Sequence, residues 1–234
     1  NPLLNYQLYF EAPFLELTTS YYTEQCKLWL ASENSNLQIY LHRVSRVIQL
    51  EKERGHEYLH PSTLSKLLKV LYQVLLLDKQ LEIMIHARDS EIDKGVDLLL
   101  KNHLYDDLKR LYTLYSASQS INAMTLLANK VASYITQVIT QLIVKSNENE
   151  NEKQFVPALM AIYQSFQSTL LQCLPHPLFD KSCSEALEQV LSQKINHFTI
   201  EELLASYADQ MLKKGGILQQ VHANDIVAQT LKCQ

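Results

Sequence analysis

Apolar residues recur at steps of three and four through almost the whole of this 234-residue chain. Near the N-terminus the steps are 4, 3, 4 and 7, in the series Phe10, Phe14, Leu17, Tyr21 and Leu28. Such spacing places side chains on one face of an α-helix, and it predicts a helix over residues 4–30. The chain has only four Gly and six Pro, whereas all-β proteins with many turns usually need more. The sequence therefore predicts an all-α fold without strands.

Later parts of the chain continue the same pattern. The apolar series that predict further helices are Leu37, Leu41, Val44 and Ile48; Leu64, Leu67, Leu68, Leu71 and Leu75; Leu108, Leu111, Tyr112 and Tyr115; Met124, Leu127, Val131, Tyr134, Val138 and Leu142; and Phe155, Leu159, Ile162, Phe166 and Leu170. Residues 67–77 are apolar on nearly all sides, which is typical of a helix that lies between other helices. Many helices with short connections favour an elongated stack of antiparallel helices, a helical solenoid.

Two prolines mark expected helix ends. Pro61 is predicted to end the second helix, because proline disfavours helical backbone in the residue before it. Ser62 is then predicted to cap the next helix through its side-chain oxygen. Pro157 is expected in the first turn of a later helix, where its missing N–H group is tolerated.

Two polar segments mark further boundaries. Thr199-Ile200-Glu201-Glu202 has the spacing of a capping box, in which Thr199 and Glu202 each satisfy a free backbone N–H group at a helix start. Residues 146–153 read SNENENEK. This segment is predicted to be a disordered loop, because it is polar and of low complexity.

Composition narrows the kinds of partner that the chain is expected to bind. The formal net charge is -4 and the isoelectric point is near 6.1, so a basic surface for nucleic acid is not expected. No stretch is apolar for as many as about 18 residues, so no membrane partner is expected. The four cysteines form no CxxC pair, which favours reduced thiols in a cytoplasmic or nuclear protein.

One catalytic motif is present: His56, Glu57 and His60 form the HExxH pattern of zinc proteases. That chemistry needs both His side chains on one helix face, with the Glu as general base. Pro61 follows directly, so His60 is expected at the end of a helix, and no strand is predicted that would hold a peptide substrate. A polar helix end is therefore the favoured interpretation, with a zinc hydrolase as a remote alternative.

A second cluster, Cys173, His176 and Cys183, lacks a fourth metal ligand. The sequence contains no P-loop, no dinucleotide-binding glycine motif and no GxSxG nucleophile motif. We therefore predict no catalytic residue, no cofactor site and no metal site, and we do not expect the chain to be an enzyme.

Several segments, taken together and in order, resemble the cullin family. They are YFEAPFLELT (residues 9–18) with Tyr21-Tyr22, Glu53-Arg54, YLHPST (58–63), DLKRLYTLYS (107–116) and ELLAxY (202–207). The resemblance covers nearly the whole chain. It places His60 in a segment that cullins use structurally, which weighs against the zinc alternative.

The resemblance implies a domain organisation, because cullins have a stalk of helical repeats followed by a globular C-terminal domain. Residues 1–90 are expected to be part of a middle helical repeat, and residues 91–197 the last repeat, with the loop near 146–153. Residues 198–234 are expected to hold the first helix of the C-terminal domain and a tail.

The resemblance also implies a function. The chain is expected to be a non-catalytic scaffold segment of a cullin-RING type E3 ubiquitin ligase, in ubiquitin-dependent protein degradation. Such a scaffold holds the substrate adaptor and the RING subunit with its conjugating enzyme at a fixed distance. The docking sites for the adaptor and the RING subunit are expected outside this chain, in a protein of the cytoplasm and nucleus. An unrelated α-helical solenoid or tethering protein is the alternative.

Overall fold

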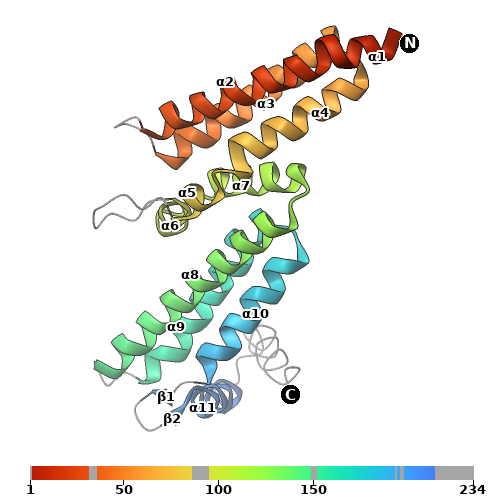
Figure 1. The fold of residues 1–234 in the computed structure, drawn as a ribbon. Helices are drawn as coiled ribbons and strands as arrows, with labels where there is room; N and C mark the ends of the chain where they lie inside the picture. The colour runs from red at the N-terminus through yellow and green to blue at the C-terminus, as the bar shows by residue number, and fades with distance from the viewer. Residues whose placement is uncertain are drawn as a thin grey trace. The chain divides into compact units, whose positions relative to one another are not determined.

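The computed structural model describes residues 2–31, 36–85, 95–148, 152–192, 194–195 and 198–213. These residues form two compact units, Asn1–Val131 with Cys173–Leu178, and Ala132–Gln172 with Phe179–Gln234. The boundary lies within one helix, α8 (Ile121–Glu148), which contributes to both units (Figure 1). Almost all of the described residues are helical, which confirms the predicted all-α class.

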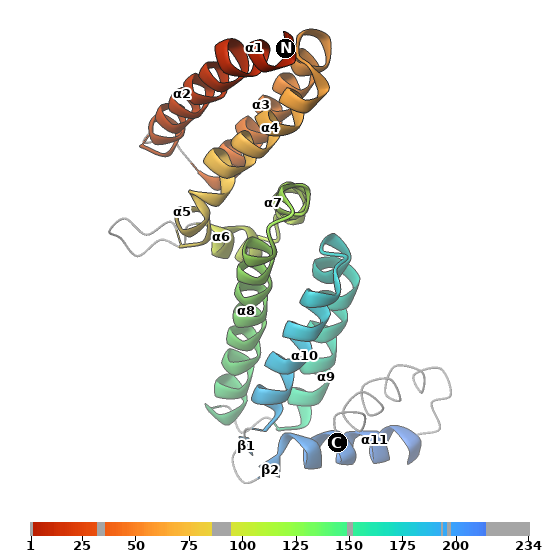
Figure 2. The same ribbon diagram turned by 45° about the vertical axis from the view of Figure 1, so that its right-hand side comes forward.

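The first unit is built from helices that follow one another closely in sequence. They are α1 (Pro2–Tyr6), η1 (Gln7–Glu11), α2 (Ala12–Ala31), α3 (Leu37–Tyr58), α4 (Pro61–Tyr72), η2 (Gln73–Leu77), α5 (Gln80–Ile85), α6 (Val96–Lys101), α7 (Tyr105–Ser118) and the start of α8. The segments η1 and η2 are single π-helical turns that continue the neighbouring α-helices. Together α1, η1 and α2 form the helix that the sequence predicts over residues 4–30. In this unit α3 and α4 lie on one side of α2 (Figures 1 and 2).

The core of the first unit follows the predicted apolar series of α3 and α4. Leu37, Leu41, Val44 and Ile48 are all buried in α3. The segment 67–77 is buried on more than one side, because Val74, Leu75 and Leu76 are consecutive and all lie inside. The π-helical turn η2 widens the helix at this point and packs against α2 as well as α7.

The second unit contains the rest of α8, α9 (Glu152–Ser165), η3 (Phe166–Leu170), η4 (Leu171–Cys173) in part, α10 (Pro177–Leu191), β1 (Lys194–Ile195), β2 (Phe198–Thr199) and α11 (Ile200–Lys213). Within it, α9 contacts α11, and the rings of Tyr134 and Phe166 meet edge to face at 6.3 Å. The capping box is confirmed: the Thr199 N–H donates to Glu202 Oε2 at 2.9 Å, and the Glu202 N–H donates to Thr199 Oγ1 at 3.2 Å.

The prediction that the chain has no strands is wrong in a small respect. Lys194 pairs with Thr199 and Ile195 pairs with Phe198 in a two-stranded antiparallel ladder. The two strands are two residues long, too short to show the alternation by which a strand is recognised in sequence.

The predicted disordered loop is wrong at both of its ends. Helix α8 extends to Glu148 and α9 begins at Glu152, while residues 149–151 lie outside the described part of the chain. Helix α8 continues because its buried face does: Ile143 and Ser146 are both buried, one turn apart. The polar residues at the start of this segment therefore continue a helix, with Ser146 on its buried face.

Other local predictions also need correction. Pro157 lies in the interior of α9, not in its first turn, because α9 begins five residues earlier. The N-cap of α4 is His60 rather than Ser62, and Pro61 occupies the first helical position. In α8 the predicted buried series is rotated by one position after Val131. The buried apolar residues beyond that point are Ala132, Ile135, Ile139 and Ile143, whereas Tyr134, Val138 and Leu142 are only half-buried.

Candidate functional site

The HExxH residues are not arranged as a zinc site. Helix α3 ends at Tyr58, so His56 and Glu57 are helical but His60 lies beyond the helix, in extended backbone. His60 Nδ1 accepts a hydrogen bond from the Ser62 N–H at 3.3 Å and lies 2.8 Å from the Ser62 hydroxyl. Because the two His side chains do not share a helix, they lack the geometry in which the motif binds zinc. The ring of His60 instead caps α4.

The residues of the second candidate cluster lie in different local elements: Cys173 ends η4, His176 precedes α10 and Cys183 lies within α10. Cys183 is buried in α10, and burial raises the pKa of its thiol to about 12. His176 precedes α10, and its Nδ1 accepts a hydrogen bond from the Leu178 N–H at 3.2 Å. Among the described residues, no group of three or more His, Cys, Asp or Glu side chains is placed to hold a metal ion.

The most distinctive polar cluster surrounds Glu11, in the π-helical turn η1. Its side chain is buried and accepts hydrogen bonds from the Thr63 hydroxyl at 2.5 Å and from the Lys66 ammonium group. The Tyr6 hydroxyl lies 3.2 Å from Thr63 Oγ1, which can accept its proton, and it accepts a hydrogen bond from the His60 N–H at 3.4 Å. The cluster therefore joins the N-terminal helix to the start of α4, more than fifty residues later.

The partners of Glu11 determine its charge state. The hydrogen bond from Lys66, and then the one from Thr63, hold the pKa of the Glu11 carboxyl below its ordinary value, against the opposing effect of its burial. Glu11 is therefore ionised at neutral pH. It acts as an anchor between two helices rather than as an acid that exchanges protons.

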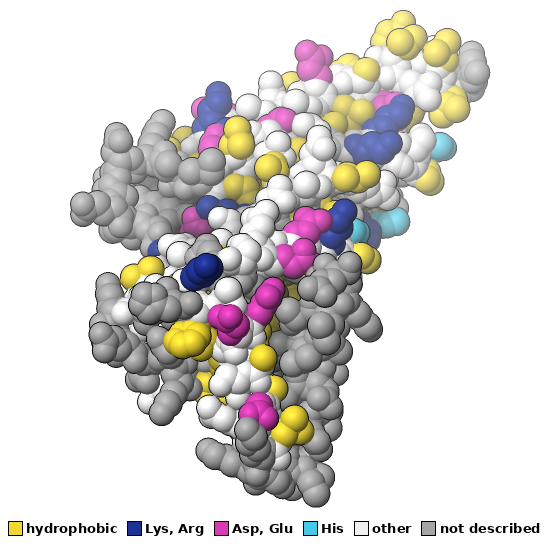
Figure 3. All heavy atoms as spheres, turned by 90° about the horizontal axis from the view of Figure 1, so that it is seen from below, with side chains coloured by type: hydrophobic (Ala, Val, Ile, Leu, Met, Phe, Trp, Pro, Cys, Tyr) yellow, Lys and Arg dark blue, Asp and Glu magenta, His cyan; other side chains and the backbone are white. Residues whose placement is uncertain are grey.

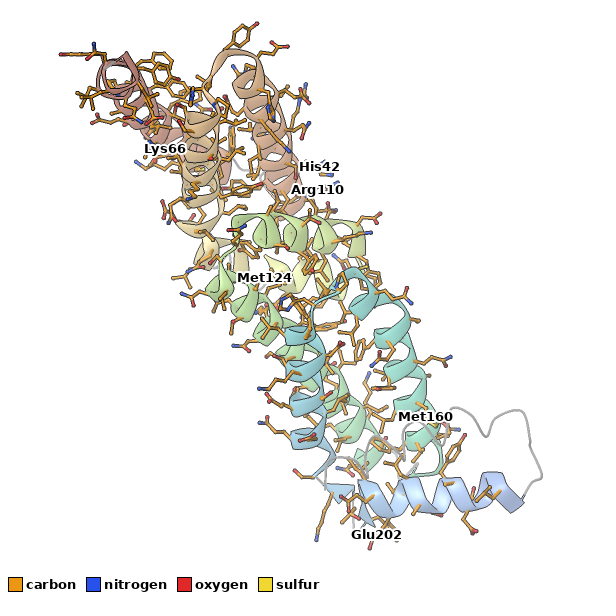
Figure 4. The ribbon with its side chains drawn as sticks, turned by 90° about the vertical axis from the view of Figure 1, so that its right-hand side faces the viewer. His42, Lys66, Arg110, Met124, Met160 and Glu202 are labelled. Carbon is orange, nitrogen blue, oxygen red and sulfur yellow. The ribbon has the colours of Figure 1, made fainter. Side chains whose placement is uncertain are left out.

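A second buried carboxylate, Asp107, joins α7 to α3. It accepts a hydrogen bond from Gln38 Nε2 at 2.6 Å and one from the Arg110 guanidinium group. His42 Nε2 lies 3.6 Å from the same carboxylate, and Figure 4 shows His42 and Arg110 near one another at this junction. Gln38 and His42 lie one turn apart in α3, so a single carboxylate fixes α7 against two successive turns.

Tyrosine hydroxyl groups connect other helices of the first unit. Tyr22 of α2 donates to Glu51 Oε1 of α3 at 2.5 Å, and burial, followed by this carboxylate, raises the pKa of Tyr22. Tyr40 donates to the Leu75 carbonyl at 2.6 Å and lies 3.5 Å from the Cys26 sulfur. The Tyr115 hydroxyl is buried and has no hydrogen-bond partner among the described residues. All three tyrosines are buried, and the contacts of Tyr22 and Tyr40 join neighbouring helices of this unit.

One face of the molecule carries charged side chains of both signs. On the face drawn in Figure 3, the described basic and acidic side chains are interspersed with hydrophobic ones. No helix of the described part is long and apolar enough to pass through a lipid bilayer.

The two carboxylate clusters give a structural role to residues of the cullin-like segments, for which the sequence analysis gave none. Glu11 and Thr63 come from two of the segments that carry the cullin resemblance, and Asp107 and Arg110 come from a third. Neither cluster was predicted, because a local pattern contains no sign that residues 52 or 69 positions apart meet. A sequence signal that could have pointed to them is a carboxylate directly beside a residue of a predicted apolar series: Glu11 follows Phe10, and Asp107 precedes Leu108.

Comparisons with known proteins agree with the all-α helical fold described above. The family model described as "Cullin alpha solenoid domain" matches residues 3–233. Cullin-2 of Arabidopsis thaliana is 28% identical over 240 residues, which cover 96% of this chain and 31% of that protein. Cullin-3 of Caenorhabditis elegans is 24% identical over 90% of this chain and 27% of its own length. Cullin-1 of Oryza sativa subsp. japonica is 27% identical over 72% of this chain and 24% of its own length.

Proposed function

Since this chain belongs to the cullin family, we propose that it is a non-catalytic scaffold segment of a cullin-RING type E3 ubiquitin ligase. The chain spans about a third or less of the length of the relatives reported above. The substrate adaptor and the RING subunit are therefore proposed partners of the whole protein, with docking sites proposed to lie outside this chain. The site of action that we propose is the cytoplasm and nucleus.

The observation that carries the proposal is the match to a cullin solenoid over residues 3–233. This match removes the reason for considering an unrelated solenoid. The break between α3 and α4 at His60 also weakens the zinc hydrolase alternative, because that enzyme requires both His side chains on one helix.

The proposed mechanism is geometric. A scaffold accelerates ubiquitin transfer by holding the substrate near the loaded conjugating enzyme, which raises their effective concentration without a catalytic side chain of its own. Buried anchors such as Glu11 and Asp107 suit this role, because they fix the packing of helices that are distant in sequence. We propose the same three parts as the sequence indicates: residues 1–90 and 91–197 as helical repeats, and 198–234 as the start of a further domain.

The proposal is tested by purifying the tagged protein at its natural level from the cells that produce it. Mass spectrometry is expected to find a RING subunit and a substrate adaptor at near-equal molar amounts. In a second assay, the 234-residue chain alone is expected not to increase ubiquitin chain formation by a RING subunit and a conjugating enzyme. Absence of a RING subunit from the purified protein, or stimulation by the isolated chain, would contradict the scaffold proposal.

A further inference from the structure

Helix α3 carries a short surface of arginine and aliphatic side chains on its outer side. Its exposed residues before position 51 are Ile39, His42, Arg43, Arg46, Gln49 and Leu50. Because successive helical residues turn by about 100°, four of these residues fall in one row, opposite the buried series of the same helix. We define the α3 stripe as this row, Ile39, Arg43, Arg46 and Leu50. It is about 16 Å long, since each helical residue advances by about 1.5 Å.

The composition of the α3 stripe differs from that of an ordinary solvated helix face. Its end residues Ile39 and Leu50 are 40% and 43% exposed, and none of the exposed residues named above is a lysine, an aspartate or a glutamate. Arginine is enriched at protein interfaces, whereas those three residue types are depleted there. The α3 stripe therefore has the composition of an interface.

The two arginines of the stripe have no partner of opposite charge on this chain. Arg43 and Arg46 are exposed, and no ion pair among the described residues includes either of them. By contrast, the guanidinium groups of Arg54 and Arg110 each contact a carboxylate of their own helix. The guanidinium groups of Arg43 and Arg46 are therefore available to a carboxylate from outside.

One carboxylate of a neighbouring helix lies beside the stripe. Asp107 Oδ1 is 3.6 Å from Nε2 of His42, which flanks the stripe (Figure 4). Asp107 is buried, and it already accepts hydrogen bonds from Gln38 and Arg110. It therefore does not serve as the partner of the two arginines of the stripe.

The charge of the stripe determines what kind of segment can cover it. An apolar helix would bury the guanidinium groups of Arg43 and Arg46 without partners, which is strongly unfavourable. A segment with carboxylates opposite these two residues satisfies both groups through charge-assisted hydrogen bonds. Apolar side chains at the two ends of that segment meet Ile39 and Leu50. We propose that the α3 stripe binds an acidic, amphipathic segment of another protein.

The residues around the stripe favour an acidic protein segment over nucleic acid. Beyond Leu50, the same side of α3 carries the exposed residues Glu53 and Glu57, which repel a phosphate backbone that follows the helix. The positive part of the stripe spans the single turn from Arg43 to Arg46, which suits a pair of carboxylates better than a row of phosphates.

The test is photo-crosslinking of the whole protein, at its natural level, in the cells that produce it. Ile39 is replaced by p-benzoylphenylalanine, an apolar photo-crosslinking amino acid, and mass spectrometry identifies the captured segment. The expected product is a segment of a different protein with an excess of Asp and Glu over Lys and Arg. The control position for the crosslinker is Ile121, which is 76% exposed in α8 and is expected not to capture that segment.

Two further variants test whether the charge of the stripe causes the binding. Arg43→Gln combined with Arg46→Gln removes both charges and is expected to lower the crosslinking yield at least about fivefold. The matched control is Arg54→Gln, at an exposed arginine of the same helix that already contacts Glu51. This control is expected to change the yield by less than about twofold. Circular dichroism of the variant chains checks that each keeps its helical content.

The proposal is overturned if no protein segment is captured, if the captured segment has no acidic excess, or if nucleic acid is captured instead. It is also overturned if the double substitution of Arg43 and Arg46 leaves the yield unchanged, or if Arg54→Gln lowers it equally. A captured segment of this same protein would assign the stripe to packing within the protein and would likewise overturn the proposal. None of these results bears on the proposed scaffold function.

Discussion

Helices α2 and α3 carry equally regular apolar series, but only the series of α3 is buried. In α3, Leu41 and Val44 are fully inaccessible to solvent, whereas in α2 Leu17 and Tyr21 are 71% and 57% exposed. The two helices lie in the same unit, and both were identified from the same three- and four-residue spacing. Helical periodicity thus identifies a helix, and it does not identify which of its faces is buried.

This difference in burial follows from the kind of side chain that each helix places against its neighbours. The buried side of α3 is apolar, and burial of such side chains stabilises the fold directly. The buried side of the N-terminal helix instead includes Glu11, Tyr22 and Cys26, whose polar groups are satisfied by α4, α3 and η2. Buried polar groups stabilise a particular arrangement only when each finds its partner. Helix α2 is therefore attached through these hydrogen bonds together with apolar contacts, such as that between the rings of Trp29 and Tyr40 at 6.4 Å, while its apolar series stays largely exposed in this structure.

The largest expected effect comes from truncating one residue in each series. Leu41→Ala in α3 should lower the free energy of unfolding by about 2–5 kcal/mol, because it leaves a cavity in the core. Leu17→Ala in α2 should change it by no more than about 0.5 kcal/mol. Urea denaturation followed by circular dichroism, at a dilution where the chain is monomeric, measures both values.

A buried leucine in another helix tests whether other core positions behave like Leu41. Leu108→Ala, at a fully buried site in α7, should behave like Leu41→Ala and unlike Leu17→Ala. If Leu17→Ala and Leu41→Ala lowered the free energy of unfolding equally, Leu17 would be buried in solution and the contrast between the apolar series of α2 and α3 would not hold.

The next effect in size concerns the carboxylate that joins α7 to α3. Asp107→Ala leaves Gln38 and Arg110 without their shared acceptor. It should therefore lower the free energy of unfolding by about 1–3 kcal/mol. The matched control is Asp106→Ala, one residue earlier in the same first turn but exposed. If both substitutions lowered the free energy of unfolding equally, Asp107 would stabilise the protein through its interaction with the helix dipole and not through its hydrogen bond to α3.

A smaller effect is expected at the link between α2 and α3. Tyr22→Phe removes the hydroxyl that donates to Glu51 and should cost about 1 kcal/mol. Tyr21→Phe, at the exposed neighbouring position, should leave the free energy of unfolding unchanged. If Tyr21→Phe lowered the free energy of unfolding more than Tyr22→Phe, the side of α2 that carries Tyr21 would be the buried one, contrary to the structure.

The smallest effect is a change in pH dependence at Glu11. Because its folded-state pKa lies below the ordinary value, the ionised carboxylate stabilises the fold above that value. This stabilisation is lost as the pH falls through the lowered pKa. Between pH 6 and about pH 3, the wild type should therefore lose more stability than Glu11→Gln. Urea midpoints at the two pH values measure the difference, and identical losses would show that Glu11 is not ionised in a buried cluster.

Much of the fold was predictable because its signals are local. The apolar series of α3, the capping box at Thr199 and the cullin-like segments each depend on neighbouring residues. The orientation of the N-terminal helix was not predictable, because it depends on Glu11 meeting Thr63 and Lys66, 52 and 55 residues away. Likewise, the HExxH pattern was present in the sequence, but the turn at His60 determines that it forms a cap and not a zinc site.

The most direct test of this account is hydroxyl-radical footprinting of the dilute wild-type chain, which compares the two series without any substitution. The account predicts that Leu17, Tyr21 and Leu28 are modified much faster than Leu37, Leu41 and Val44, once each rate is corrected for the intrinsic reactivity of its residue type. Protection of the α2 series to the level of the α3 series, in a chain shown to be monomeric, would contradict it.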